Sequence, residues 1–156
     1  MQDILFVCTG NTCRSPMAEA IANRLFKTEN LPYQAFSRGI NVLMPARASE
    51  NAVKAMQLIH QFNLNGHIAR QVSAEDMQRA YLVLVMTESH KHYLHMVFPQ
   101  YSQKVLTLCE FAGHDQAEIR DPYGQDLYEY RACADDLEKN IRTLFSRLRE
   151  RKEGLL

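Results

Sequence analysis

Four short, mostly apolar runs are spaced along the chain, each bounded by polar or turn-forming residues. Three of them are nearly continuous and rich in Ile, Leu, Val and Phe, which is typical of strands buried within a parallel sheet. The remaining run alternates apolar and polar positions and ends at Gly39. The predicted strands cover residues 3–8, 33–37, 81–86 and 104–108.

Segments with helical spacing of apolar positions lie between and after these runs. Ser15-Pro16 is a typical helix start, with Ser as the N-cap and Pro in the first turn, and this helix should continue to Phe26. Ser73 should cap a short helix. Further helices are predicted over residues 46–62, 90–98 and 127–148. Strands that alternate with helices indicate an α/β fold with a mainly parallel sheet.

The composition fits one domain spanning residues 1–156. Hydrophobic residues make up 46% of the chain, enough to bury a core. Eighteen basic residues balance eighteen acidic ones, which disfavours a nucleic-acid binder. No run approaches the roughly 18 apolar residues of a membrane span, and the apolar start is too short for a signal peptide. The four cysteines lack the pattern of a disulfide scaffold, so we expect a cytoplasmic protein.

The segment Cys8–Ser15 joins the first predicted strand to the first predicted helix. Backbone N–H groups of such a turn can converge on an anion at the helix N-terminus. Gly10 and Asn11 tolerate the positive φ that a curled loop demands, and Arg14 offers a planar fork for two phosphate oxygens. The same positive environment would favour a nucleophilic thiolate at Cys8. The alternative is that Cys8 is a small buried strand residue.

Asp121 begins an Asp-Pro-Tyr-Gly turn. A phenolate leaves far more easily once protonated, because the pKa of phenol is about 10. Asp121 could donate that proton, although an ordinary Asx turn explains the same residues.

The loop, with its flanking residues 7–19, resembles the signature of the low-molecular-weight protein-tyrosine-phosphatase family. His67-Ile68-Ala69-Arg70-Gln71, Val85-Met86-Thr87-Glu88-Ser89 and Asp121-Pro122-Tyr123-Gly124 resemble further family segments, in the same order. The resemblance covers nearly the whole chain. It implies a four-stranded parallel sheet flanked by helices in a three-layer domain, with the phosphate loop after strand 1.

The resemblance also implies roles for individual residues. Cys8 would form a phosphocysteine, Arg14 would stabilise the transition state, and Asp121 would act as general acid and then as base. Residues Thr9, Gly10, Asn11, Thr12, Cys13 and Arg14 would bind phosphate, and Asn11, Ser15 and His67 would hold the loop in shape. Cys13 would form a reversible disulfide with Cys8, the alternative being a buried small residue. No cofactor or metal is implied.

Thr12 departs from the isoleucine that tyrosine phosphatases of this family usually carry. Threonine is found in the branch of bacterial members that act as protein-arginine phosphatases, and its hydroxyl could accept a hydrogen bond from a guanidinium. We therefore expect phosphoarginine as the preferred substrate and phosphotyrosine as a weaker one. Leu43 and Tyr123 are predicted to form pocket walls, or else to be a core and a turn residue.

Two other functions remain open. A thioredoxin-coupled arsenate reductase would share the loop but needs closely spaced extra thiols, and Cys109 and Cys133 lie 24 positions apart. A phosphocarrier or binding-only module would not need Asp121. His90, His92 and His95 are interpreted as a solvated helix face, because their spacings do not converge on one metal ion. The predicted partner is a phosphorylated protein, and a monomer is favoured.

Overall fold

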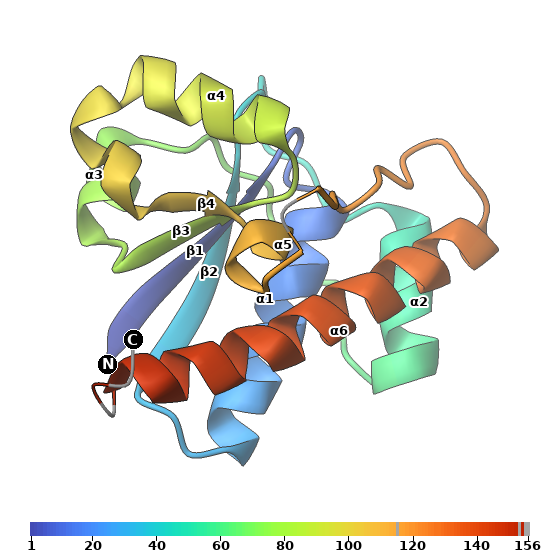
Figure 1. The fold of residues 1–156 in the computed structure, drawn as a ribbon. Coiled ribbons are helices and arrows are strands. Elements are labelled where there is room, and N and C mark those ends of the chain that lie inside the picture. The colour runs from blue at the N-terminus through green and yellow to red at the C-terminus, as the bar shows by residue number, and fades with distance from the viewer. Residues whose placement is uncertain (115, 153, 155–156) are drawn as a thin grey trace.

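The computed structural model describes residues 1–114, 116–152 and 154. Four strands and six α-helices follow one another along these residues, with a 3₁₀ turn over Pro99–Lys104 (Figure 1). The strands are β1 (Gln2–Cys8), β2 (Tyr33–Gly39), β3 (Leu82–Val85) and β4 (Val105–Thr107). The helices are α1 (Arg14–Thr28), α2 (Glu50–His60), α3 (Ala74–Arg79), α4 (Glu88–Val97), α5 (Leu108–Phe111) and α6 (Leu127–Lys152).

All four strands pair in parallel, in the order β2-β1-β3-β4. The chain moves from β1 outward to β2 and then crosses to the other side of β1 to form β3. Such a reversal opens a crevice at the carboxyl ends of the central strands, where ligands of α/β proteins bind. Cys8 is the last residue of β1 and therefore lies at this edge.

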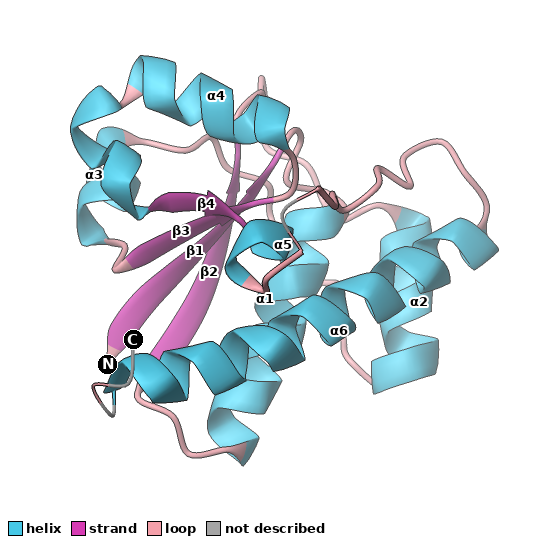
Figure 2. Cartoon of the chain, viewed as in Figure 1, coloured by secondary structure: helices cyan, strands magenta, loops and turns pink. Residues whose placement is uncertain are grey.

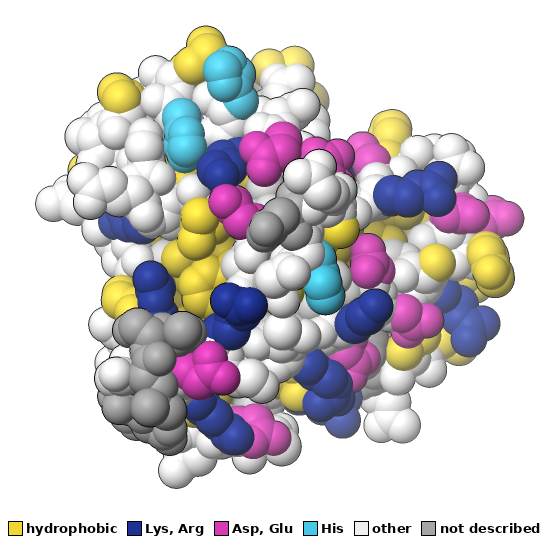
Figure 3. Space-filling view, viewed as in Figure 1, with side chains coloured by type: hydrophobic (Ala, Val, Ile, Leu, Met, Phe, Trp, Pro, Cys, Tyr) yellow, Lys and Arg dark blue, Asp and Glu magenta, His cyan; other side chains and the backbone are white. Residues whose placement is uncertain are grey.

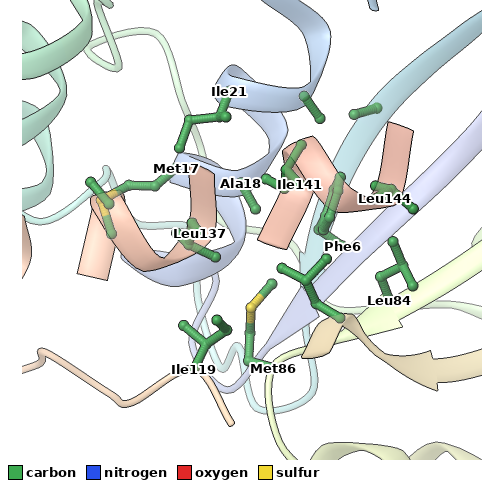
Figure 4. Packing of buried hydrophobic residues seen from close by; sticks show 14 of the residues in the cluster. Phe6, Met17, Ala18, Ile21, Leu84, Met86, Ile119, Leu137, Ile141 and Leu144 are labelled. Carbon is green, nitrogen blue, oxygen red and sulfur yellow. The ribbon is translucent and has the colours of Figure 1, made fainter. Parts of the chain in front are cut away.

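Helices cover both faces of the sheet, with α3 and α4 on one side and α1, α5 and α6 on the other (Figure 2). Side chains of β1 alternate between the two layers. Ile4 and Phe6 join the larger apolar cluster, and Leu5 and Val7 join the smaller one. Figure 4 shows Phe6 and Leu84 of the sheet meeting side chains of α1 and α6 in the larger cluster. The predicted α/β architecture and its four-stranded parallel sheet are confirmed.

Three predicted helix starts are wrong. Helix α4 begins at Glu88 with Thr87 at the N-cap, two residues before the predicted start at residue 90. Helix α1 begins at Arg14 with Cys13 at the N-cap, so Ser15 lies inside the first turn and its hydroxyl serves the loop instead. Helix α2 begins at Glu50 rather than residue 46, because the preceding segment pairs with a distant one: the Ala69 N–H donates to the Ala46 carbonyl at 2.7 Å, and Arg47 forms an antiparallel bridge with Ile68.

The surface in Figure 3 mixes acidic and basic side chains, in line with the balanced charge. Across the described part of the chain, no helix combines the length and the apolar character that crossing a membrane requires.

Candidate active site

Four carbonyl groups of the loop between β1 and α1 point outward and accept hydrogen bonds from other segments. The segments packed around it supply the donors, so the planar peptides direct N–H groups towards the centre of the loop. The accepting carbonyls and their donors are Cys8 with Ile40 N–H (3.0 Å), Thr9 with Asn41 N–H (2.9 Å), Asn11 with His67 Nε2 (2.7 Å) and Thr12 with Ser49 N–H (2.9 Å). A ring of inward N–H groups at a helix N-terminus is suited to bind a phosphate dianion.

Asn11 fixes the tightest point of this loop. It is buried and adopts a left-handed backbone with φ of 55°. Its Nδ2 donates to Ser15 Oγ (2.8 Å) and to Ser37 Oγ (3.0 Å), and its Oδ1 accepts from the Arg70 N–H (3.0 Å). These bonds offset the cost of a positive φ in a residue with a Cβ.

Of the two residues that tolerate positive φ, Asn11 adopts it in the loop and Gly10 does not. A Cβ at Gly10 would lie 3.7 Å from Thr12 Oγ1, in ordinary contact. The glycine that the loop does require is Gly39, where a Cβ would lie 2.7 Å from the Thr9 carbonyl oxygen. The end of β2 can therefore pack directly against the loop backbone.

Cys8 lies buried at the base of the loop. Its Sγ is 2.9 Å from Ser15 Oγ and accepts from the Asn11 N–H at 3.3 Å. The Asn11 N–H is a fixed donor to the sulfur, and the Ser15 hydroxyl can add a second hydrogen bond to a Cys8 thiolate, because a thiolate can only accept.

Arg14 and Asp121 meet above the loop. Arg14 is buried, and its Nη1 donates to the Ile119 carbonyl at 3.1 Å. Its Nη2 lies 3.4 Å from Asp121 Oδ2, while Asp121 Oδ1 accepts from the Tyr123 N–H at 3.1 Å. Asp121 thus forms the Asx turn and also faces the arginine, while its role as the general acid stays a prediction. Its side chain is 51% exposed, which leaves it accessible to a substrate.

A pocket of about 420 Å³ opens over these residues. Thr12 and Tyr123 line it, and Tyr123 is 71% exposed at its rim. Leu43 is 93% exposed and is not among the lining residues, so its role as a wall stays a prediction. The pocket is lined by Cys8, Thr9, Gly10, Thr12, Cys13, Arg14, Asn41, Asp121 and Tyr123.

Cys13 is a buried free thiol with polar neighbours. Its Sγ is 3.3 Å from both Tyr130 OH and Ser49 Oγ. Burial and the Cys13 contact raise the pKa of Tyr130 to about 12, so this phenol stays protonated at neutral pH. A disulfide between Cys13 and Cys8 remains a prediction.

The other two cysteines are unsuited to thiol exchange. Burial is the main cause that raises the pKa of Cys109 to about 11 and that of Cys133 to about 12. Both thiols therefore stay protonated and unreactive, which argues against a reductase that passes a disulfide onward.

His90 is the residue near the site that sequence patterns missed. The expected solvated face is wrong for it: His90 is 4% exposed, and its Nε2 lies 2.8 Å from Thr9 Oγ1. Burial first, and then the nearby Arg14, lower its pKa to about 4, so the ring is neutral at neutral pH. His92, two positions on, is exposed as expected.

The depressed pKa of His90 predicts a loss of stability in acid. As the pH falls from 6.5 to about 4, the unfolded chain binds a proton that the folded chain does not. The free energy of unfolding should therefore decrease over this range, by up to about 3 kcal/mol for this group. Urea unfolding from pH 7 to pH 4 would measure it, with His90→Gln as the control that lacks this part of the slope. Identical slopes for the two proteins would contradict the prediction.

A buried cysteine inside a ring of N–H groups, with an arginine and a carboxylate above it, defines a cysteine-dependent phosphatase. Comparisons with known proteins agree. The model of the family described as low molecular weight phosphotyrosine protein phosphatase matches residues 3–153. The chain belongs to this family, and the resemblance seen in the sequence is confirmed.

The relatives are named for two activities, protein-arginine-phosphatase and protein-tyrosine-phosphatase. A protein-arginine-phosphatase of Bacillus subtilis is 38% identical over 148 residues, covering 95% of this chain and 97% of the relative. The low molecular weight protein-tyrosine-phosphatase PtpB of Staphylococcus epidermidis is 37% identical over 128 residues, covering 81% and 86%. The solved structure of the YwlE arginine phosphatase, in a cysteine-to-serine variant with a phosphorylated active-site serine, matches with a TM-score of 0.90 and 37% identity, covering 96% of this chain and 97% of that one.

Proposed function

We propose that this chain hydrolyses phosphorylated protein side chains through a phosphocysteine at Cys8 and that phosphoarginine is its preferred substrate. The observation that carries the reaction type is the position of Cys8 beneath the inward N–H groups, with Arg14 and Asp121 above it. The phosphorylated active-site serine of the YwlE variant supports a covalent intermediate on the nucleophile.

The first step forms an S–P bond and breaks the bond from phosphorus to the substrate. The Cys8 sulfur attacks phosphorus while the loop N–H groups and Arg14 hold the equatorial oxygens. Asp121 gives its proton to the departing nitrogen or oxygen. In the second step Asp121 takes a proton from water, the water oxygen attacks phosphorus, and the S–P bond breaks to return the thiolate and free phosphate.

The substrate preference rests on the polar lining of the pocket. A guanidinium group carries several N–H donors and needs acceptors around it. Thr12, Asn41 and Asp121 are polar residues on the pocket wall, whereas Tyr123 is the one aromatic residue among those that line it. The phenol ring of phosphotyrosine would bind more tightly against an apolar wall than against these polar residues. The 38% sequence identity to a protein-arginine-phosphatase of Bacillus subtilis supports the same preference for phosphoarginine.

The test is hydrolysis of phosphoarginine and phosphotyrosine peptides by the wild-type protein, with Cys8→Ser as the blank. A higher kcat/KM on phosphoarginine, absent in Cys8→Ser, supports the proposal. A higher kcat/KM on phosphotyrosine would keep the reaction type and overturn the substrate, and a stable phosphocysteine without turnover would support a phosphocarrier instead.

Changing Thr12 should shift the preference between the substrates. Thr12→Val removes the hydroxyl at nearly constant volume, and Thr12→Ile adds apolar surface as well. Loss of one hydrogen bond should lower the phosphoarginine-to-phosphotyrosine ratio of kcat/KM by about threefold to tenfold in Thr12→Val. The decrease should be larger in Thr12→Ile. An unchanged ratio in both variants would remove Thr12 as the cause of the preference.

The cytoplasmic location and the monomeric state stay predictions. A reaction that requires a free Cys8 thiol suits a reducing compartment, and the balanced surface charge suits a protein partner better than a nucleic acid.

A further inference from the structure

We propose that His90 is a positioning residue of this reaction, which fixes the Thr9 side chain and so the first turn of the phosphate loop. This inference rests on the proposed function. It adds a residue on a helix that carries none of the expected catalytic groups.

The contact joins two distant parts of the chain. His90 comes from the first turn of α4, and its Nε2 lies 2.8 Å from Thr9 Oγ1, 81 positions away. Thr9 directly follows the nucleophile and is itself exposed. Its carbonyl is held on the other side by the Asn41 N–H at 2.9 Å. With both the side chain and the carbonyl held, the peptide that follows Thr9 has one orientation towards the phosphate.

The start of α4 is also tied to the segment that precedes Asp121. The Glu88 N–H donates to Glu118 Oε1 at 2.8 Å. The Ile119 N–H donates to the Met86 carbonyl at 3.0 Å, and the Ile119 carbonyl accepts from Arg14 Nη1 at 3.1 Å. The start of α4, which carries His90, therefore contacts both the nucleophile loop and the segment that leads to Asp121. It can fix the position of one relative to the other.

The fold alone gives no reason for an imidazole here. His90 is almost completely buried, and within the described residues its Nδ1 has no hydrogen-bond partner. A buried ring nitrogen without a partner costs stability, and a leucine of similar size would fill the space without that cost. What the imidazole adds is the bond to Thr9.

The ring acts as a neutral group. Burial disfavours the charged form and the nearby Arg14 adds to this effect, so the pKa of His90 falls to about 4. The bond to Thr9 is therefore present across the neutral range, and the loop gains a fixed hydroxyl without a second cation beside Arg14.

A double-mutant cycle between His90 and Thr9 tests the proposal. The variants are His90→Leu, Thr9→Val and the pair, with His92→Leu as the matched control on the exposed side of α4. The readouts are kcat/KM on a phosphotyrosine and a phosphoarginine peptide and the dissociation constant of inorganic phosphate. Each single variant should lose about threefold to tenfold in kcat/KM and bind phosphate more weakly, as for one lost hydrogen bond. His92→Leu should match the wild type.

The double variant separates positioning from mere packing. If the contact carries the effect, the pair should be no worse than the worse single variant, because both remove the same bond. His90→Gln, whose amide can reach the position of Nε2, should recover most of the activity. Losses that add, or His90→Gln as impaired as His90→Leu, would overturn the proposal.

Two further outcomes are distinguishable. If His90→Leu fails to fold, Thr9→Val and His90→Gln still report on the bond, and wild-type phosphate affinity and kcat/KM in Thr9→Val would then overturn the proposal. If the wild type itself hydrolyses neither peptide, the proposed function fails. In that case weaker phosphate binding in the single variants, without further weakening in the pair, would still support the part of the inference that concerns the loop.

Discussion

Replacing Cys8 by serine should abolish turnover on phosphoarginine and phosphotyrosine peptides alike. A hydroxyl is a far weaker acid than a thiol, so the serine stays protonated at neutral pH and attacks phosphorus poorly. The loss should be on the order of 10⁴-fold or more in kcat, the scale seen when a covalent nucleophile is removed. Steady-state hydrolysis at saturating peptide would measure it.

The fold and the phosphate cradle should survive this substitution. Ser15 Oγ and the Asn11 N–H can bond a hydroxyl as they bond the Cys8 sulfur, and Arg14 is untouched. Cys8→Ser should therefore still be stabilised by inorganic phosphate in a thermal melt. Cys109→Ser makes the same chemical change outside the loop and should keep its turnover. Residual activity in Cys8→Ser above about 1% of wild type would point to a different nucleophile.

The nucleophile loop could be predicted from the sequence because its parts are local. A buried strand, a polar turn and a helix start follow one another within residues 3–26, and their order alone places Cys8 at the end of a parallel strand. The helices were located for the same reason, although α5 was missed. Its capping box of Thr107 and Glu110 is visible in the sequence, but the strand predicted over residues 104–108 includes Thr107 and the first residue of α5.

The support of the loop is tertiary and could not be derived from local patterns. Asn11 is held by His67 and by the Arg70 N–H, 56 and 59 positions away. Nothing in the composition of residues 67–70 shows that they return to the loop. The family resemblance suggested a role for His67, and the structure shows the contact through which it would act.

His90 shows how a pattern can mislead. Its neighbours His92 and His95 lie at spacings that match no single metal ion, and a polar helix face was the simplest account. The burial of His90 depends on the tertiary packing of α4, which lies against β3 and β4, and helical periodicity contains no information about that packing. Thr12 is different again: its place in the pocket follows from the loop, and what its hydroxyl does is set by the substrate group that enters the pocket.

Replacing Asp121 by asparagine should give the other large loss, and the loss should depend on the leaving group. Removing a general acid lowers the rate by about 10²-fold to 10⁴-fold. The phenol released from phosphotyrosine has a pKa of about 10, and the guanidinium released from phosphoarginine has a higher one, so both leaving groups need a proton to depart. Nitrophenyl phosphate has a much better leaving group and should lose far less. Rates of Asp121→Asn on the three substrates would measure this, with Asp126→Asn, an exposed carboxylate in the same loop, as the matched control.

The same variant separates proton donation from a purely electrostatic role. Asparagine keeps an oxygen that can accept from the Tyr123 N–H, so the turn should hold its shape. It also removes the negative charge that faces Arg14 at 3.4 Å. The phosphate affinity of Asp121→Asn should thus equal or exceed that of the wild type, while kcat falls. An equal loss on all three substrates would instead show that Asp121 acts by orienting Arg14, because orientation of the phosphate matters whatever group departs.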